Sequence, residues 1–301
     1  ALLLDQFGVL HDGRRPYPGA VAAVSAAAAA GLRLLIISNS SRRSGGTLDK
    51  LAGMGFDPGC FEGVVTSGEL THRYLSTRPD SWWAGLGRRC LHINWSKRGP
   101  ASLEGLELEV EPGGMARGAG PVVTDPSTCD FILAHGTEGL SLPGGGVAEV
   151  PLEELRRMLT ALAEAGRGGR LPPMVVANPD VVTVDGGGLV AMPGSLAASY
   201  GRAGGPVQLM GKPSPLIYAA CEEVLRLAAG ELLAVGDSLE HDVAGVYFGN
   251  GCFWGRQKDF VDVETQQLGR QPERLTALVG YAAGTRVGPG GKVCYVYSDP
   301  R

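Results

Sequence analysis

Residues 2–13 read Leu-Leu-Leu-Asp-Gln-Phe-Gly-Val-Leu-His-Asp-Gly. The apolar run at 1–4 predicts a buried strand, and the carboxylate of Asp5 follows it directly. Beyond this strand, helix and strand signals alternate: a helix between Pro18 and Gly31, a strand at 32–37, a helix at 44–55 and a strand at 63–66. Such alternation predicts an α/β fold with a Rossmann-like parallel sheet.

The pattern changes after about residue 70. Residues 71–205 carry longer Gly/Pro loops, new strand signals at 90–94, 130–134 and 174–177, and a helix from Pro151 to Gly166. The earlier pattern resumes with a strand at 207–210, a helix at 214–228 and a strand at 232–235. We therefore expect a core in two halves, residues 1–70 and 206–245, around an inserted α/β domain at 71–205.

Composition excludes several functional classes. A net charge of −4 gives no electrostatic footprint for nucleic acid or an anionic membrane, and no apolar run approaches the ~20 residues that span a bilayer. The six cysteines stand at wide spacings without a CxxC pair, which argues against a zinc cluster or a disulfide scaffold. We expect a soluble protein of a reducing compartment, the cytoplasm or an organelle. Because the chain begins at Ala1 without Met, we expect preceding residues, including any targeting segment, to be missing.

Four chemically useful side chains stand where strands of the core are predicted to end. They are a carboxylate, a hydroxyl, an ammonium and a second carboxylate: Asp5, Ser38, Lys212 and Asp237. The carboxyl ends of parallel strands meet at one edge of a sheet, and ligands bind there. This set is sufficient for phosphoryl transfer through an aspartyl-phosphate with a bound Mg²⁺.

Four segments resemble the motifs of the haloacid dehalogenase superfamily, in the family's order. They are residues 5–13, Ser-Asn-Ser-Ser at 38–41, Gly-Lys-Pro-Ser-Pro at 211–215 and Gly-Asp-Ser-Leu-Glu-His-Asp at 236–242. The insert, with Ala-Asn-Pro-Asp at 177–180 and Pro-Gly-Ser-Leu at 193–196, resembles the class IIA cap of nucleotide- and sugar-phosphate phosphatases. Over residues 1–245 the resemblance implies a Mg²⁺-dependent phosphohydrolase.

The resemblance also implies a role for each position. The carboxylate of Asp5 would attack phosphorus and ligate Mg²⁺. The other metal ligands would be one main-chain carbonyl and two carboxylates: those of Phe7, Asp237 and Asp242. The phosphoryl group of a small phosphorylated metabolite would be bound by a hydroxyl, an amide and an ammonium: those of Ser38, Asn39 and Lys212.

Position 7 departs from the family pattern. Phosphatases of the family place a second Asp there to protonate the leaving oxygen and activate water, whereas this chain has Phe7. General acid–base catalysis is worth about 10²–10⁴ in rate. We hypothesise that His11 or Asp12 substitutes for the missing carboxyl. The alternative is a non-catalytic module that binds a phosphorylated ligand.

Residues 246–301 resemble a different family, peptide-methionine (S)-S-oxide reductase, also called methionine sulfoxide reductase A, which has an α+β fold. The resemblance rests on Gly-Cys-Phe-Trp-Gly at 251–255, Gly-Tyr-Ala-Ala-Gly at 280–284 and Lys-Val-Cys-Tyr at 292–295. It implies that Cys252, at the start of a predicted helix that favours the thiolate, attacks the sulfoxide sulfur. Phe253 and Trp254 would hold the S-methyl group of free or peptide methionine sulfoxide, and thioredoxin or another thiol reductant would restore Cys252.

Two further points remain open at the level of sequence. Cys294 is either a resolving thiol or a buried structural cysteine. The family's acidic residue falls beyond Arg301, so we expect the reductase segment to be incomplete. A fragment, a faulty gene model and a natural fusion would each explain this, and the segment would then be a working domain or an inert remnant.

The remaining histidines and tryptophans receive structural interpretations. The histidines show no metal-ligand spacing, so we expect surface or capping roles for His72, His92, His135 and His241. We expect packing within the inserted domain for the tryptophans Trp82, Trp83 and Trp95.

Overall fold

The computed structural model describes residues 1–110, 114–115, 121–122, 129–143, 145–166, 171–185 and 188–237. All of these residues belong to one compact unit, Ala1–Ala244. Four predicted site residues lie outside the described residues: Asp242, Cys252, Phe253 and Trp254. The same holds for His241 and Cys294.

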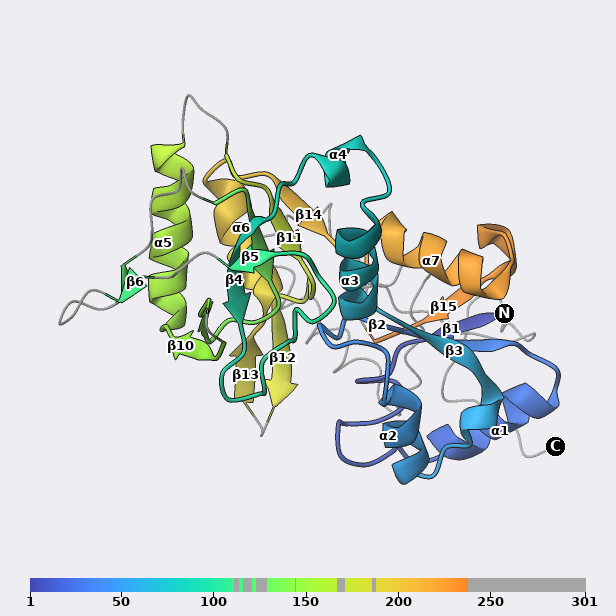
Figure 1. Ribbon diagram of the computed structural model, residues 1–301. Coiled ribbons are helices and arrows are strands. Elements are labelled where there is room, and N and C mark those ends of the chain that lie inside the picture. Colours follow the sequence, from blue (N-terminus) through green and yellow to red (C-terminus); the bar gives the residue numbers. More distant parts are fainter. Residues whose placement is uncertain are drawn as a thin grey trace, which may run out of the picture. The chain divides into compact units, whose positions relative to one another are not determined.

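The first sheet is parallel and has the order β15-β1-β2-β3 (Figure 1). Its strands are β1 (Leu2–Leu4), β2 (Leu34–Ser38), β3 (Phe61–Thr66) and β15 (Leu233–Val235). Because successive side chains of a strand point to opposite faces, Leu34 and Ile36 pack with helices α1 (Ala20–Ala29) and α2 (Thr47–Gly53), whereas Leu35 and Ile37 face α7 (Pro215–Leu225). The prediction of an α/β fold with a parallel sheet is confirmed.

The second sheet is mixed and has seven strands among the described residues. Its order is β10-β9-β4-β8-β11-β14, with β5 paired to β4. The bounds are β4 (Arg89–Asn94), β5 (Glu109–Val110), β8 (Phe131–Ala134), β9 (Gly139–Ser141), β10 (Val147–Glu149), β11 (Met174–Val176) and β14 (Val207–Leu209). Helices α5 (Leu152–Ala165) and α6 (Pro193–Arg202) pack on one face of this sheet.

The remaining elements lie between these in the chain. They are η1 (Pro58–Cys60), α3 (Ser67–Thr77), α4 (Ser81–Ala84), β6 (Gly114–Met115), β7 (Pro121–Val122), β12 (Val182–Asp185), β13 (Gly188–Ala191) and η2 (Ala229–Glu231).

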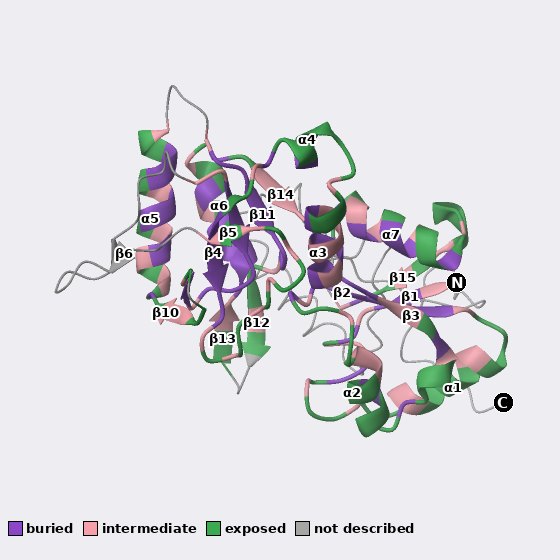
Figure 2. Ribbon diagram, viewed as in Figure 1, coloured by how far each residue is buried: buried purple, intermediate pink, exposed green. Residues whose placement is uncertain are grey.

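Helix α5 illustrates how the sequence specifies an element. Glu153 and Glu154 lie in its first turn, where negative charge is favourable against the helix dipole. Leu155, Leu159 and Leu162 recur at helical spacing and are buried against the second sheet. Figure 2 shows the resulting division of α5 into a buried and an exposed side.

The strand at 207–210 was expected to reopen the core, and this expectation is wrong. Strand β14 pairs in parallel with β11, with Met174 opposite Val207, so it forms an edge of the second sheet. A strand of three residues carries too little pattern to name its neighbour, because partner choice depends on edges built by distant residues. The chain returns to the first sheet only through α7 and β15.

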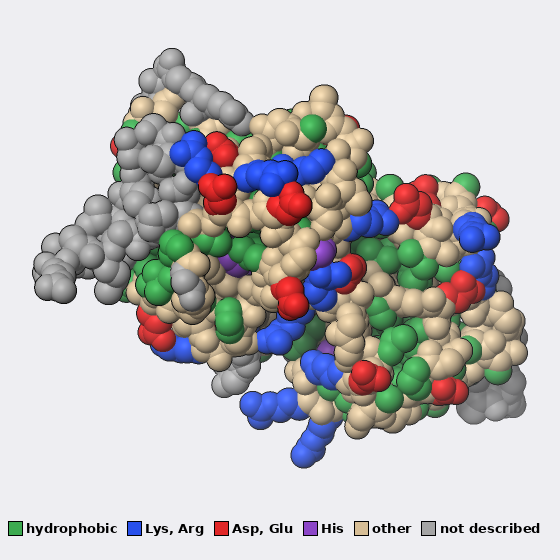
Figure 3. All heavy atoms as spheres, viewed as in Figure 1, with side chains coloured by type: hydrophobic (Ala, Val, Ile, Leu, Met, Phe, Trp, Pro, Cys, Tyr) green, Lys and Arg blue, Asp and Glu red, His purple; other side chains and the backbone are tan. Residues whose placement is uncertain are grey.

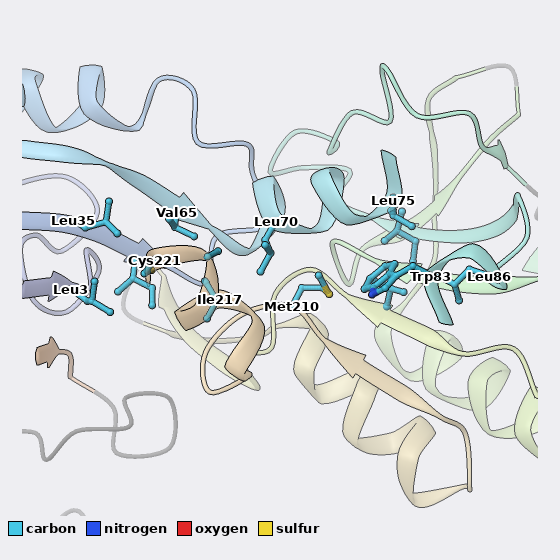
Figure 4. Packing of buried hydrophobic residues seen from close by; sticks show 14 of the residues in the cluster. Leu3, Leu35, Val65, Leu70, Leu75, Trp83, Leu86, Met210, Ile217 and Cys221 are labelled. Carbon is cyan, nitrogen blue, oxygen red and sulfur yellow. The ribbon is translucent and has the colours of Figure 1, made fainter. Parts of the chain in front are cut away.

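One apolar cluster runs from the first sheet to the second. It contains Leu3 and Ile37 of the first sheet and Phe131 of the second, together with side chains of α3 and α7. Figure 4 shows Leu3 with Leu70 of α3 and Ile217 of α7. Trp83 is buried in the same cluster at 3 % exposure, as the packing interpretation of the tryptophans expected, and Trp95 is also buried, whereas Trp82 is exposed. The two sheets are therefore in contact through a shared core.

The face of the molecule shown in Figure 3 carries charged side chains of both signs. Lys and Arg side chains are interspersed with Asp and Glu side chains on the face shown in Figure 3. Among the described residues, no helix combines the length and the apolar character that a membrane span requires.

Candidate active site

Asp5 and Lys212 form the centre of the site. Asp5 directly follows β1, and its main-chain N–H donates to the carbonyl of Val235 in the neighbouring strand at 2.9 Å. Its Oδ2 lies 2.7 Å from Nζ of Lys212, and the two side chains are 14 % and 2 % exposed. Its Oδ1 accepts from the N–H of Gln6 at 2.7 Å. A buried ammonium thus faces a carboxylate that retains some access to solvent.

Asn39 holds the main chain of Lys212 in place. Its Oδ1 accepts from the N–H of Lys212 at 2.6 Å, and its Nδ2 donates to the carbonyl of Lys212 at 3.2 Å and to Oδ1 of Asp180 at 2.7 Å. These bonds occupy both ends of the amide. Asn39 was expected to bind phosphate, but its amide is already used to position Lys212.

Ser38 ends β2, beside the strand that carries Asp5. It is 8 % exposed, and its Oγ accepts from the N–H of Ser40 at 3.3 Å. Because β1 and β2 pair in parallel with Leu4 opposite Ile36, Ser38 and Asp5 leave the sheet at the same edge. A hydroxyl that accepts from a main-chain N–H keeps its own proton for donation.

Asp237 reaches the loop that follows Asp5. Val235 pairs with Leu4, so Asp237 leaves β15 at the same edge of the sheet. A Cβ added to Gly8 would lie 1.7 Å from Oδ2 of Asp237, which means that this carboxylate lies directly against the main chain of Gly8. Gly8 also has φ +91, a conformation that favours glycine. The lack of a side chain at position 8 is what lets the carboxylate approach.

The side chain of Phe7 has no group that can transfer a proton. The ring is 39 % exposed and packs edge-on against His11, with ring centroids 6.5 Å apart. A Cβ built on Gly13 would lie 3.3 Å from the ring. Phe7 therefore contributes a main-chain carbonyl and an apolar surface to this loop.

Neither proposed substitute for the missing carboxyl is well suited to proton transfer. Burial, followed by the charge of Lys50, lowers the pKa of His11, whose Nδ1 accepts from the N–H of Gly13 at 3.0 Å. The neutral ring therefore carries its proton on Nε2, which is buried without a hydrogen-bond partner within the described residues. Asp12 accepts from the N–H groups of Arg14 and Arg15, and these bonds lower its pKa, so it stays ionised.

Three contributors were missed by sequence reasoning. Gly8 and Asp180 belong to quoted motifs, but nothing in the sequence shows that one lies against Asp237 and the other binds Asn39. Tyr17 is the third: its pKa is raised by burial and then by the negative charges of Asp12 and Asp237, so its hydroxyl stays protonated. The one signal available in the sequence was Gly8, which stands shortly after the acidic residue Asp5 at the end of a predicted strand.

The donor set fits a hard divalent cation. Asp5 and Asp237 flank a loop whose main-chain carbonyls are further oxygen donors, and Mg²⁺ prefers oxygen ligands of this kind. Because Gly8 has no side chain, the carboxylate of Asp237 has room to contact both this loop and a bound cation. Asp242, also expected as a ligand, lies outside the described residues.

Comparison with known proteins agrees with this arrangement. The family model of haloacid dehalogenase-like hydrolases matches residues 2–98. These residues are therefore similar to haloacid dehalogenase-like hydrolases. Chronophin from Bos taurus is similar to this chain, with 29 % identity over 260 residues, which cover 83 % of this chain and 77 % of the relative. The similarity thus extends beyond the matched core into the inserted domain.

Solved structures share the fold of this chain over most of its length. A haloacid dehalogenase-like hydrolase from Brucella suis 1330 is 25 % identical with a TM-score of 0.58, covering 80 % of this chain and 79 % of that one. The p-nitrophenyl phosphatase from Archaeoglobus fulgidus is 21 % identical with a TM-score of 0.53, covering 90 % and 93 % of the two chains. At this identity the second likeness supports the fold alone.

Proposed function

We propose that the haloacid dehalogenase-like domain is a Mg²⁺-dependent phosphohydrolase that acts on a small phosphorylated metabolite through an aspartyl-phosphate. The buried contact between Asp5 and Lys212, with 2.7 Å between Oδ2 and Nζ, is the observation that carries this proposal. A carboxylate held beside a buried ammonium can approach a negatively charged phosphoryl group with less repulsion. The similarity to a haloacid dehalogenase-like hydrolase from Brucella suis 1330 is consistent with it.

The reaction would proceed in two steps. An oxygen of Asp5 forms a bond to phosphorus while the bond between phosphorus and the ester oxygen breaks, and the electron pair leaves on that oxygen, which takes a proton from water. Water then attacks the acyl phosphate, which releases inorganic phosphate and restores the carboxylate. Ser38 would donate to a phosphoryl oxygen, and Lys212 would offset negative charge in both steps. A bound Mg²⁺, held by Asp5, Asp237 and the carbonyl of Phe7, would supply further charge neutralisation.

A phosphate-ester panel assayed with Mg²⁺ and with EDTA tests the proposal. Asp5→Asn is expected to abolish phosphate release, because an amide is a poor nucleophile. Asp57→Asn is the matched control, since Asp57 is an exposed carboxylate that only caps a turn through the N–H of Gly59. Hydrolysis that persists at the same rate in Asp5→Asn would contradict the assignment of the nucleophile.

The second candidate is a module that binds a phosphorylated ligand without turning it over. Phe7 favours it, because the side chain at this position has no proton to transfer. Beryllium fluoride, a phosphoryl analogue, would then bind in a Mg²⁺-dependent manner while no ester in the panel releases phosphate. Repeated turnover of any ester that depends on Asp5 excludes this candidate.

For residues 246–301 we propose, from the sequence resemblance alone, a peptide-methionine (S)-S-oxide reductase segment with Cys252 as its nucleophile. Phe253 and Trp254 would contact the substrate, and thioredoxin would be the reductant. None of the similar proteins named above is a sulfoxide reductase. Reduction of a methionine sulfoxide by dithiothreitol that disappears in Cys252→Ser would support the segment's activity, and an inactive full chain would identify it as a remnant.

A further inference from the structure

A buried row of polar side chains crosses one face of the second sheet. Asn94 and His92 belong to β4, Ser141 ends β9, and His135 follows β8. Their exposures are 2 %, 1 %, 9 % and 5 %, respectively. The expectation that His92 and His135 lie at the surface or cap helices is therefore wrong. Burying a polar group is unfavourable unless it is hydrogen-bonded, so each member of the row needs a partner.

The hydrogen bonds of this row have one possible direction. Oδ1 of Asn94 accepts from the N–H groups of Trp95 and Ala101 at 2.9 and 2.8 Å, so its Nδ2 must be the donor to Oγ of Ser141 at 3.0 Å. The described residues offer the hydroxyl proton of Ser141 no acceptor other than Nδ1 of His92, 2.9 Å away, so the hydroxyl donates to that nitrogen. The amide of Asn94 and this single acceptor together set the direction of the later bonds.

The direction fixes the tautomers of both histidines. With Nδ1 of His92 accepting, its proton is on Nε2 and is donated to Nδ1 of His135 at 3.0 Å. Neutral His135 must then carry its own proton on Nε2, for which the described part of the chain contains no acceptor. Burial lowers the pKa of His135 to about 4 and that of His92 well below its usual value, so both rings are neutral near pH 7.

His135 lines a cavity of about 220 Å³ beside α3. The other walls are a loop after β2, which contains Ser41, Arg42 and Arg43, residues of α3 and a loop after β4. No Asp or Glu is among these lining residues. The cavity therefore offers hydrogen-bond donors without carboxylates.

One positive charge at the cavity is left without a carboxylate. Arg43 forms a double ion pair with Glu69, at 2.7 and 2.8 Å. Arg42 instead donates to the main-chain carbonyl of Arg98, and the described residues include no carboxylate partner for it. One anionic group, such as a carboxylate, would balance the charge of Arg42.

We propose that this cavity binds the carboxylate of a small organic molecule, with the Nε2–H of His135 and the guanidinium of Arg42 as its donors. A volume near 220 Å³ is below the ~300–1,000 Å³ of pockets that hold whole drug-sized ligands, so it suits a small acid or one end of a larger molecule. The carboxylate belongs either to the proposed substrate, at the end away from phosphorus, or to a separate effector. Ser41 and Arg42 follow Ser38 on one loop. A substrate or an effector bound to Arg42 can therefore affect the site around Asp5 through the position of Ser38.

Nitrogen-15 NMR of histidine rings in the full chain tests the tautomers first. His92 and His135 are expected to show the neutral Nε2–H form at pH 7, and Ser141→Ala to release His92 from it. Ser195→Ala is the matched control, because Ser195 is a buried serine whose Oγ has no partner in the described residues. An Nδ1–H form of His135 in the unaltered protein overturns the proposal, whatever the variants do.

A titration with succinate tests the ligand. Succinate is expected to shift the ring resonances of His135, and His135→Phe or Arg42→Gln to weaken its binding about 10- to 100-fold, the effect of losing one hydrogen bond to a charged group. Absence of a shift, or equal binding by both variants, overturns the proposal. If His135→Phe does not fold, Arg42→Gln, at an exposed position, decides the point.

Enzyme kinetics separate the two sources of the carboxylate. Succinate that raises KM for a phosphate ester at constant kcat would make the cavity part of the substrate site. A change in kcat, or binding with no kinetic effect, would identify a separate ligand site. The NMR titration works equally in Asp5→Asn protein, so failure of the phosphohydrolase proposal would not be confused with failure of this one.

Discussion

Phe7 is the residue whose replacement would report most directly on catalysis. Phe7 lies between Asp5 and Gly8, and the carboxylate of Asp237 lies against the main chain of Gly8. The ring of Phe7 is partly exposed and transfers no proton. Phe7→Asp would restore a carboxyl and is expected to raise kcat about 10²- to 10⁴-fold, the usual worth of general acid–base catalysis. The measurement is steady-state phosphate release.

Phe7→Asn is the control for this substitution. Asn has nearly the size of Asp but does not act as an acid or a base near neutral pH, so this variant is expected to leave kcat near the starting value. Equal kcat for the Asp and Asn variants would show that proton transfer at position 7 does not limit the reaction.

Asn39 acts on catalysis through another residue. Its amide holds both the N–H and the carbonyl of Lys212, so Asn39→Ala should let the ammonium move away from Asp5. We expect kcat to fall about 10- to 100-fold, on the order of 1.4–2.7 kcal/mol of lost positioning. Mg²⁺ affinity, measured by calorimetry, should change little, because the hydrogen bonds of the Asn39 amide go to Lys212 and Asp180. A Mg²⁺ affinity that falls in step with kcat would speak against a positioning role.

At the scale of elements, the loop that follows β1 depends on one glycine. Gly8→Ala would place a methyl group 1.7 Å from Oδ2 of Asp237, at a φ of +91. The carboxylate must then move, so we expect Mg²⁺ affinity and kcat each to fall at least about tenfold, as for loss of a ligand or its support. Calorimetric titration of Mg²⁺ and phosphate release would measure the two effects.

Gly19→Ala controls for backbone strain alone. Gly19 has a similar φ of +82, but nothing lies within 4 Å of the position its Cβ would take. Both variants should lose about 1 kcal/mol of stability from the positive φ. Only Gly8→Ala should lose Mg²⁺, and a parallel loss in Gly19→Ala would refute the steric argument.

The elements also mark the boundary of what sequence could predict. Strands β1 and β2 were predictable because an apolar run followed by a polar residue is a local pattern, and this placed Asp5 and Ser38 at one edge of the sheet. The bond between Asn39 and Lys212 joins positions 173 apart, and that between His92 and His135 joins positions 43 apart. No local pattern encodes such pairs. The same reason explains why β14 was assigned to the wrong sheet.

At the scale of the molecule, the shared apolar cluster should couple the two sheets. Phe131 of β8 is fully buried in the cluster that also contains Leu3 and Ile37 of the first sheet. Phe131→Ala is expected to lower the free energy of unfolding by about 3–5 kcal/mol. Amide hydrogen exchange should show lower protection in β1 and β2 as well as in β8. Val184→Ala, at a position 55 % exposed, is the control.

Unchanged protection of β1 and β2 in Phe131→Ala would show instead that the two sheets unfold independently. The two sheets would then only dock against each other. The boundary between the two unfolding units would lie between α3 and the second sheet.

The buried histidines should make the whole molecule sensitive to acid. In the unfolded chain a histidine takes up a proton near pH 6.5, whereas burial lowers the pKa of His135 to about 4 in the folded chain. Between these values the unfolded state binds more protons, so stability falls as the pH drops from 6.5 towards 4. The share of His135 alone is at most about 3 kcal/mol.

Denaturant unfolding at pH 7 and pH 5 measures the slope of stability against pH, which His135→Phe should reduce. Leu133→Ala, on the strand that precedes His135, should lower stability equally at both pH values, because it removes packing without removing a proton site. An unaltered slope in His135→Phe would mean that other groups govern the acid response.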